Sequence, residues 1–221
     1  MGWLRAWWVV AVCCATAVAH GASSPDARLS EVRTALDAAS TLWDAGRYED
    51  AIARGEHALA LREAVLEGTH PDIAECLVLL ASRHLLRGNL VRAEPLLQRA
   101  LALREAALGE KHPDVARTLT HLAHVYQPAY SYPHFHGSPE RARPLLARAL
   151  AIREEALGEN HPLVAESLSY LAQLSPAGAE PLLLRALAIR EAALGQHHLE
   201  VAQTLHDLGS FYTDQRSYAR A

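Results

Sequence analysis

A seven-residue phrase occurs four times along this chain. The copies read HALALRE at 57–63, RALALRE at 99–105, and RALAIRE at both 148–154 and 185–191. Their central alanines lie 42, 49 and 37 residues apart, at Ala58, Ala100, Ala149 and Ala186. A repeat of this period predicts a solenoid of stacked units, because no single unit can bury its apolar face alone.

Each unit is predicted to contain two helices. In the second unit, small and apolar residues recur at spacings of three and four, at Ile73, Ala74, Leu77, Leu80, Ala81 and His84. This spacing is typical of one face of a helix. Gly88 interrupts it, and a second such pattern runs over residues 93–108. Two antiparallel helices joined by a short turn form a helical hairpin. Strand patterns are absent from the sequence, so the prediction is an all-α fold.

Every turn between units has a glycine shortly before a histidine, as Gly-x-x-His in three turns and as Gly68-Thr69-His70 in the first. Gly109 is expected to end a second helix in a left-handed cap. Pro113 then opens the next first helix, where a missing N–H has no cost, and Asp114 complements the helix dipole. We therefore assign a structural role in these turns to the four histidines His70, His112, His161 and His198.

The phrases LGEKHPDVARTL and AEPLLQRALALREAALG resemble the kinesin-light-chain subtype of the tetratricopeptide repeat (TPR) family. The resemblance covers roughly residues 31–221. It implies a right-handed superhelical solenoid of antiparallel helix pairs, about four complete and an incomplete fifth. The first helices would line a concave groove that docks a peptide or protein. Motor transport is not implied.

The family's pattern also implies which residues face the groove. They are Asp37, Ser40, Val78, Leu79, Ser82, Thr120, His121, His124, Ser169, Tyr170, Gln173, His206, Asp207 and Ser210. The kinesin-light-chain type often has asparagines here, which hold the backbone of an extended peptide, and this chain has none at these positions. Val78 and Leu79 either form an apolar pocket or pack against the first unit.

Charge argues against nucleic acid as the partner. The formal net charge is −4, and basic residues do not form a run or alternate with aromatic residues. The arginines are mixed with glutamates in Arg-Glu pairs, which we expect on solvated outer faces.

The first 22 residues have the form of a secretory signal peptide. One positive charge, Arg5, precedes an uncharged stretch over 6–19 that ends in the small residues Ala17-Val18-Ala19. Fourteen apolar residues are short for a membrane-spanning helix, which needs about 20. The expectation is a periplasmic or secreted protein with a linker over 23–30, and the alternative is a retained membrane anchor. After cleavage only Cys76 would remain, in a buried or half-buried position and without an internal disulfide.

Three units depart from the regular pattern. The third carries seven extra residues, in a loop over 127–139, and the fourth is short by five, so that its first helix should end early. The fifth, over 200–221, stops after its first helix. We expect a face containing Leu205, Leu208 and Tyr212 to lack its covering helix. A truncated product is the simplest explanation, and self-association by helix exchange is the alternative.

The sequence contains no phosphate-binding loop, nucleophile elbow or Cys/His dyad, which favours a protein without catalysis or cofactor. The leading hypothesis is an exported protein-interaction scaffold. The alternative is a truncated regulatory region of a larger enzyme such as a protease. A weaker alternative is metal binding through His121 and His124 together with His134 and His136 of the inserted loop.

Overall fold

The computed structural model describes residues 25–66, 70–127 and 137–214. These residues form nine α-helices and one short 3₁₀ turn, and no strand occurs among them. The helices are α2 (Pro25–Asp44), α3 (Tyr48–Val65), α4 (Pro71–Leu86), α5 (Leu90–Leu108), α6 (Pro113–Tyr126), α7 (Pro139–Leu157), α8 (Pro162–Gln173), α9 (Ala179–Leu194) and α10 (Leu199–Asp214), with η1 (Pro176–Gly178) between α8 and α9.

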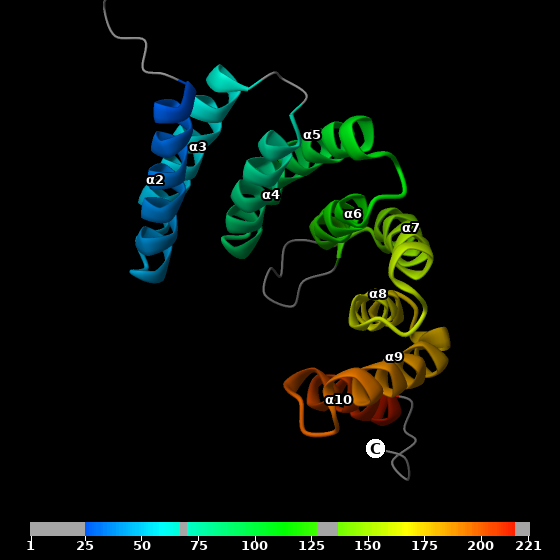
Figure 1. The fold of residues 1–221 in the computed structure, drawn as a ribbon. Coiled ribbons are helices and arrows are strands. Elements are labelled where there is room, and N and C mark those ends of the chain that lie inside the picture. Colours follow the sequence, from blue (N-terminus) through cyan, green and yellow to red (C-terminus); the bar gives the residue numbers. More distant parts are fainter. Residues whose placement is uncertain (1–24, 67–69, 128–136, 215–221) are drawn as a thin grey trace, which may run out of the picture.

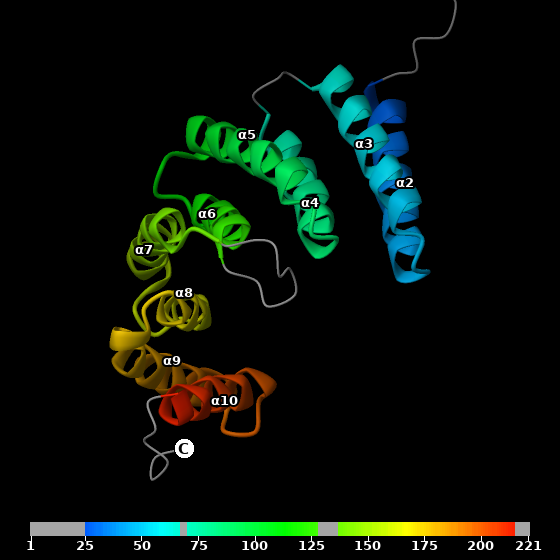
Figure 2. The ribbon, with the colours of Figure 1, turned by 180° about the vertical axis from the view of Figure 1, so that it is seen from behind.

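The helices form antiparallel pairs that follow one another along an arc (Figure 1). The pairs are α2 with α3, α4 with α5, α6 with α7, and α8 with α9, and α10 packs on α9. The first helices α4, α6 and α8 lie on the inner side of the arc, and the second helices α5, α7 and α9 lie on the outer side (Figure 2). The prediction of an all-helical repeat solenoid is therefore confirmed.

Small side chains lie where the two helices of a pair come closest. The central alanine of the phrase is fully buried in all four copies. Larger apolar side chains fill the space beside these alanines, at Leu77, Leu97, Leu119, Leu146 and Leu168. Close-packed contacts of this kind require a small residue at the crossing point.

The turn histidines have the structural role predicted for them, and the structure shows that they perform it by capping the first helices. The Nδ1 atoms of His70, His112, His161 and His198 each accept a hydrogen bond from the backbone N–H two residues later, at 3.1–3.2 Å. Gly109 has the expected positive φ, 86°, but its ψ of 155° is extended rather than left-handed helical. Only glycine adopts this conformation without strain, and it sends the chain away from the helix toward the next unit.

The last arginine of the phrase corrects our expectation of solvated Arg-Glu pairs. Arg104, Arg153 and Arg190 are only 2%, 3% and 6% exposed. Each lies four residues after the buried alanine of its phrase, so the helix turns both side chains to the same face. The correction therefore follows from helical geometry.

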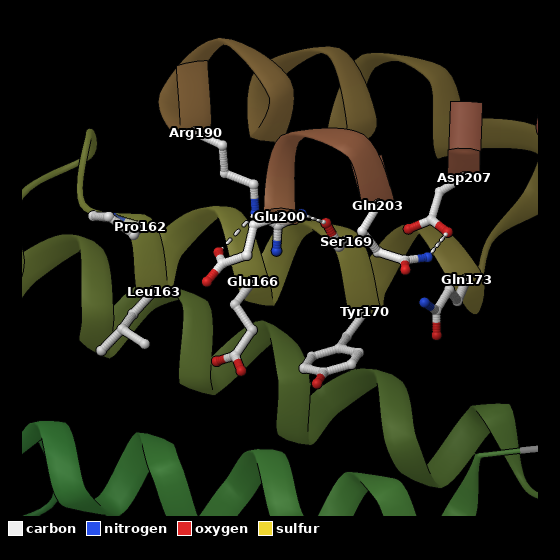
Figure 3. Close-up of a pocket in the computed structure, with 10 residues that line it drawn as sticks. All are labelled: Pro162, Leu163, Glu166, Ser169, Tyr170, Gln173, Arg190, Glu200, Gln203 and Asp207. Atoms are coloured by element: carbon white, nitrogen blue, oxygen red, sulfur yellow. Dashed lines mark hydrogen bonds and ion pairs between the residues drawn. The ribbon is translucent and has the colours of Figure 1, made fainter. Parts of the chain in front are cut away.

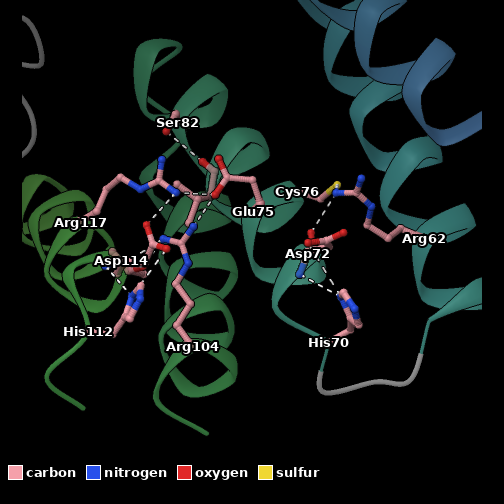
Figure 4. A network of polar contacts seen from close by, with 12 residues as sticks. Arg62, His70, Asp72, Glu75, Cys76, Ser82, Arg104, His112, Asp114 and Arg117 are labelled. Atoms are coloured by element: carbon pink, nitrogen blue, oxygen red, sulfur yellow. Dashed lines mark hydrogen bonds and ion pairs between the residues drawn. The ribbon is translucent and has the colours of Figure 1, made fainter. Parts of the chain in front are cut away.

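Each buried arginine ties its helix to the first helix of the next unit, as Figure 4 shows for Arg104. The Nη1 atom of Arg104 donates to the Asp114 carbonyl at 3.1 Å and to Thr118 Oγ1 at 2.7 Å. Arg153 repeats this with the Leu163 carbonyl at 2.9 Å and Ser167 Oγ at 2.7 Å. Arg62 donates to the Asp72 carbonyl and to Cys76 Sγ, and Arg190 to Thr204 Oγ1.

The glutamate that follows this arginine forms a different contact. Glu63 pairs with Arg99 at 2.5 Å, Glu105 with Arg148 at 2.6 Å, and Glu154 with Arg185 at 2.7 Å. Here the partner is the first arginine of the next copy, so these pairs connect successive second helices. All of these side chains are partly exposed, and for them the expectation of an outer, solvated position is correct.

We predict that the two arginines of one phrase differ in their effect on stability. Arg153→Ala should lower the free energy of unfolding by about 3 kcal/mol, because it removes a buried, hydrogen-bonded charge. Arg148→Ala, in the same helix but half-exposed, should cost less than about 1 kcal/mol. Urea unfolding followed by circular dichroism measures both. Equal costs would show that the buried contact does not hold the units together.

The last helix confirms only part of the expected uncovered face. Leu205 is 50% exposed, whereas Leu77, Leu119 and Leu168 at the same repeat position are 0–1% exposed. Leu208 and Tyr212, however, pack against Ala172, Ala179 and Leu183 of the preceding pair. They occupy the positions of Leu122 and Tyr126. Tyr126 donates a hydrogen bond to Glu94 of the preceding unit, and it also contacts Arg141 of its own second helix. Including Leu208 in the uncovered face was therefore wrong, and Tyr212 is covered on the side of the preceding pair.

Leu168 and Leu205 share one repeat position but differ in burial, so their replacement by alanine should differ in its effect on stability. Leu168→Ala should destabilise the protein by about 2–5 kcal/mol, because it leaves a cavity in a closed core. Leu205→Ala should cost about 1 kcal/mol, because half of that side chain is already in water. Thermal unfolding of the two variants provides the test. A cost at Leu205 as large as at Leu168 would mean that another segment covers it in solution.

Other expectations concern the irregular segments. The first helix of the fourth unit ends early, at Gln173, and η1 follows it, as predicted. The inserted loop begins after α6 and ends before α7, but its residues 128–136 lie outside the described residues. So do the expected signal peptide over 1–22 and the end of the fifth unit over 215–221. Among the helices that the structure describes, none is long and apolar enough to cross a membrane.

Candidate functional site

A pocket of about 390 Å³ lies between α8 and α10 (Figure 3). Both are first helices of their units, and the arginine at its base comes from the second helix α9. Most of the residues that line it have a polar side chain, and they are Pro162, Leu163, Glu166, Ser169, Tyr170, Gln173, Arg190, Glu200, Gln203 and Asp207.

The carboxylates of the pocket differ in their partners. Glu166 pairs with Arg153 at 2.7 Å, and Glu200 lies 3.3 Å from Nε of Arg190. Both arginines are buried. Asp207 instead accepts a hydrogen bond from the neutral side-chain amide of Gln203, at 3.1 Å. Asp207 is therefore the carboxylate of this pocket without a cationic partner among the described residues.

Two side-chain amides lie on neighbouring helices. Gln173 is exposed at the end of α8, and its side-chain amide has no hydrogen bond to another described residue. Gln203 on α10 uses its amide nitrogen for Asp207 and leaves its oxygen open. Such amides offer both a donor and an acceptor to a peptide backbone.

The structure brings together only some of the predicted groove residues. Ser169, Tyr170, Gln173 and Asp207 line this pocket. His121 and His124 lie on α6 beside Tyr170, Leu79 is exposed on α4, Ser82 is half-buried there, and His206 is exposed on α10 outside the pocket lining. The remaining predicted positions, Asp37, Ser40 and Ser210, are exposed on α2 and α10.

Three predicted groove residues are buried. Val78 is 3% exposed and lies in a core cluster that spans the second and third units, so it does not form an apolar pocket for a ligand. Thr120 is buried and donates its hydroxyl hydrogen bond to the Ala116 carbonyl at 3.0 Å. The buried Ser169 accepts from Arg190 at 3.1 Å. All three occupy the same repeat position, which lies at the border between the inner face and the contact with a neighbouring helix.

Sequence reasoning missed Glu166, Arg190, Glu200 and Gln203. Glu166 and Gln203 occupy one repeat position, and Glu200 follows the capping His198. A repeated spacing in the sequence could have pointed to Arg190 and its contact. In every copy a hydroxyl or thiol lies fourteen residues after the last arginine of the phrase, at Cys76, Thr118, Ser167 and Thr204.

A row of aromatic rings leads from α6 to the pocket. The ring of His124 meets Tyr170 edge-on at 4.6 Å between centroids, and His121 lies 6.2 Å from His124. Burial lowers the pKa of His121 to about 4, with smaller contributions from His124 and Arg117. Burial also lowers the pKa of His124 to about 4, assisted by Arg153. Both imidazoles are therefore neutral at pH 7.

This burial predicts a pH dependence of stability. The unfolded histidines, with a pKa of 6.5, bind protons that the folded protein excludes down to about pH 4. Stability should therefore fall as pH decreases through this window, by about 1 kcal/mol per histidine for each pH unit. The charged groups around them are Arg104, Arg117, Arg153 and Glu166.

The measurement is the free energy of unfolding between pH 7 and pH 4. The double variant His121→Gln/His124→Gln should show a shallower dependence than wild type. His57→Gln, which changes an exposed histidine on α3, should leave the dependence unchanged. The same slope in the double variant and in wild type would contradict the prediction.

The metal-binding hypothesis and the Cys76 thiol are the other candidates for chemistry in this chain. Within the described ranges, no three metal-ligating side chains come together. His134 and His136, which the metal hypothesis requires, lie outside those ranges. Cys76 is buried, as expected, and burial raises the pKa of its thiol, which disfavours the thiolate.

Comparison with known proteins identifies the class of this chain. One family model described as tetratricopeptide repeat matches residues 31–106 and 84–127, and a second model with that description matches 136–163 and 164–200. The chain belongs to the tetratricopeptide repeat family, as the resemblance indicated. A search of curated proteins found no match.

Solved structures share the fold. The kinesin-light-chain TPR-like repeats of Podosopora anserina are 23% identical with a TM-score of 0.71, over 89% of this chain and 90% of that one. BtubC (BKLC) from P. vanneervenii is 20% identical with a TM-score of 0.69, over 90% and 87%. The apo form of RapI is 18% identical with a TM-score of 0.67, over 86% of this chain and 50% of RapI. These similarities show the same kind of helical repeat.

Proposed function

We propose that this protein is an exported interaction scaffold that binds an extended segment of a protein partner on the inner face of its solenoid. TPR repeats indicate a protein-interaction scaffold, and the segment and its place are our proposal. The observation that carries it is the pocket between α8 and α10, where Tyr170 and Gln173 are open to a ligand. The proposal assigns no catalysis to the chain.

The spacing of the helices suits an extended peptide. The helices α8 and α10 both pack on α9. An extended chain advances about 3.3 Å per residue, so a segment of a few residues can cross from α8 to α10. Gln173 and Gln203 could then hold its backbone, as the asparagines of the kinesin-light-chain type do.

Export is the second part of the proposal, and it rests on the sequence of residues 1–22. Mass spectrometry of protein recovered outside the cytoplasm should give an N-terminus at or shortly after His20. An intact Met1 in a soluble cytoplasmic fraction would contradict both cleavage and anchoring.

A displayed library of random linear peptides, selected on the full-length protein, tests the binding function. We expect peptides to be recovered whose affinity falls about tenfold in Tyr170→Ala and Gln173→Ala, because each variant removes a central contact. Gln98→Ala, which changes an exposed glutamine on the second helix α5, serves as the matched control and should bind normally. A selection without binders, or binders indifferent to Tyr170 and Gln173, would refute the proposal.

A further inference from the structure

We infer that the pocket between α8 and α10 accepts a cationic side chain, lysine or arginine, of the bound segment. This inference rests on the proposed function and names the chemistry of the segment. Charge complementarity is the main argument. Three carboxylates line the pocket, and the two guanidinium groups beside them are buried in contacts between helices.

The guanidinium of Arg153 contacts Glu166 from inside the fold. Its Nη1 atom also donates to the Leu163 carbonyl and to Ser167, so its hydrogen bonds are directed into the joint between α7 and α8. The Glu166 side chain remains 35% exposed on the outside of this contact. A ligand therefore meets the carboxylate rather than the arginine.

Arg190 and Glu200 repeat this arrangement one unit later. Arg190 donates to Ser169 and Thr204, and it is buried at the base of the pocket. The Glu200 side chain is 49% exposed. Because Asp207 has only a neutral amide as its partner, three carboxylates face two guanidinium groups. One negative charge is left uncompensated, at the end of the pocket where Gln173 and Asp207 lie (Figure 3).

Tyr170 gives the pocket a surface suited to a cation. Its ring is held edge-on by His124 and extends from α8 on the same side as Glu166 (Figure 3). Ammonium and guanidinium groups bind over the face of such rings. Leu163, 41% exposed at the rim, offers apolar surface for the methylene groups of a long cationic side chain.

Nearby basic groups do not oppose this ligand. His121 and His124 are neutral at pH 7 because burial lowers their pKa to about 4. Arg117 on α6 is paired with Glu75 and Asp114. Next to Asp207 on α10, the other basic side chain is that of His206, which is exposed to solvent. An acidic side chain, by contrast, would meet like charges at Glu166, Glu200 and Asp207.

The peptide selection described above provides the probe. Peptides recovered on wild type should be enriched in lysine or arginine beside an apolar residue. For one such peptide, Asp207→Asn should weaken binding about tenfold, as should replacing the peptide's basic residue by norleucine. Binding should also weaken as salt rises, because the contact is partly exposed.

Asp50→Asn is the matched control, since it makes the same change at an exposed carboxylate on the second helix α3, and it should not alter binding. Equal affinity for wild type and Asp207→Asn, recovery of acidic peptides, or no enrichment of basic residues would overturn the inference. The proposed function would survive these results if binding still depended on Tyr170 and Gln173. A selection without any binder would refute both.

Discussion

The stacking of this solenoid depends on one buried contact that recurs at each joint between units. An arginine near the end of every second helix donates to a carbonyl, a hydroxyl or a thiol near the start of the next first helix. Thr118, Ser167 and Thr204 complete the contact by donating to the carbonyl four residues earlier. A buried charge is stable only when it is paired and hydrogen-bonded, so the contact fixes the separation and orientation of neighbouring units.

The same contact shapes the binding surface. Glu166 and Glu200 are partners of the buried arginines Arg153 and Arg190, and both also line the pocket. The arginines hold the inner edges of these carboxylates, and the exposed parts remain for a ligand. Cohesion between units and the negative character of the inner face therefore arise from the same residues. Substitutions that weaken the joint should alter the pocket as well.

The joints are not equivalent. At the first joint the side-chain acceptor is the thiol of Cys76, which is a weak acceptor. At the second joint Glu75 contacts both Arg104 and Arg117, so one carboxylate serves two neighbouring helices. The third and fourth joints each combine a hydroxyl with a carboxylate. The pocket lies between helices that these last two joints hold in place.

The sequence by itself determined the helices, their pairing, the structural role of the turn histidines and the buried alanines, because these follow from the spacing of residues within a helix and its adjoining turn. Through the family resemblance it also predicted four residues that line the pocket, Ser169, Tyr170, Gln173 and Asp207. Only the tertiary structure decided which groups of the next unit accept hydrogen bonds from Arg153 and Arg190, that Leu208 is covered while Leu205 is exposed, and that Gln203 joins Asp207 beside Gln173. Those outcomes depend on which helix of a neighbouring unit approaches each face, and periodicity within one helix does not contain that information.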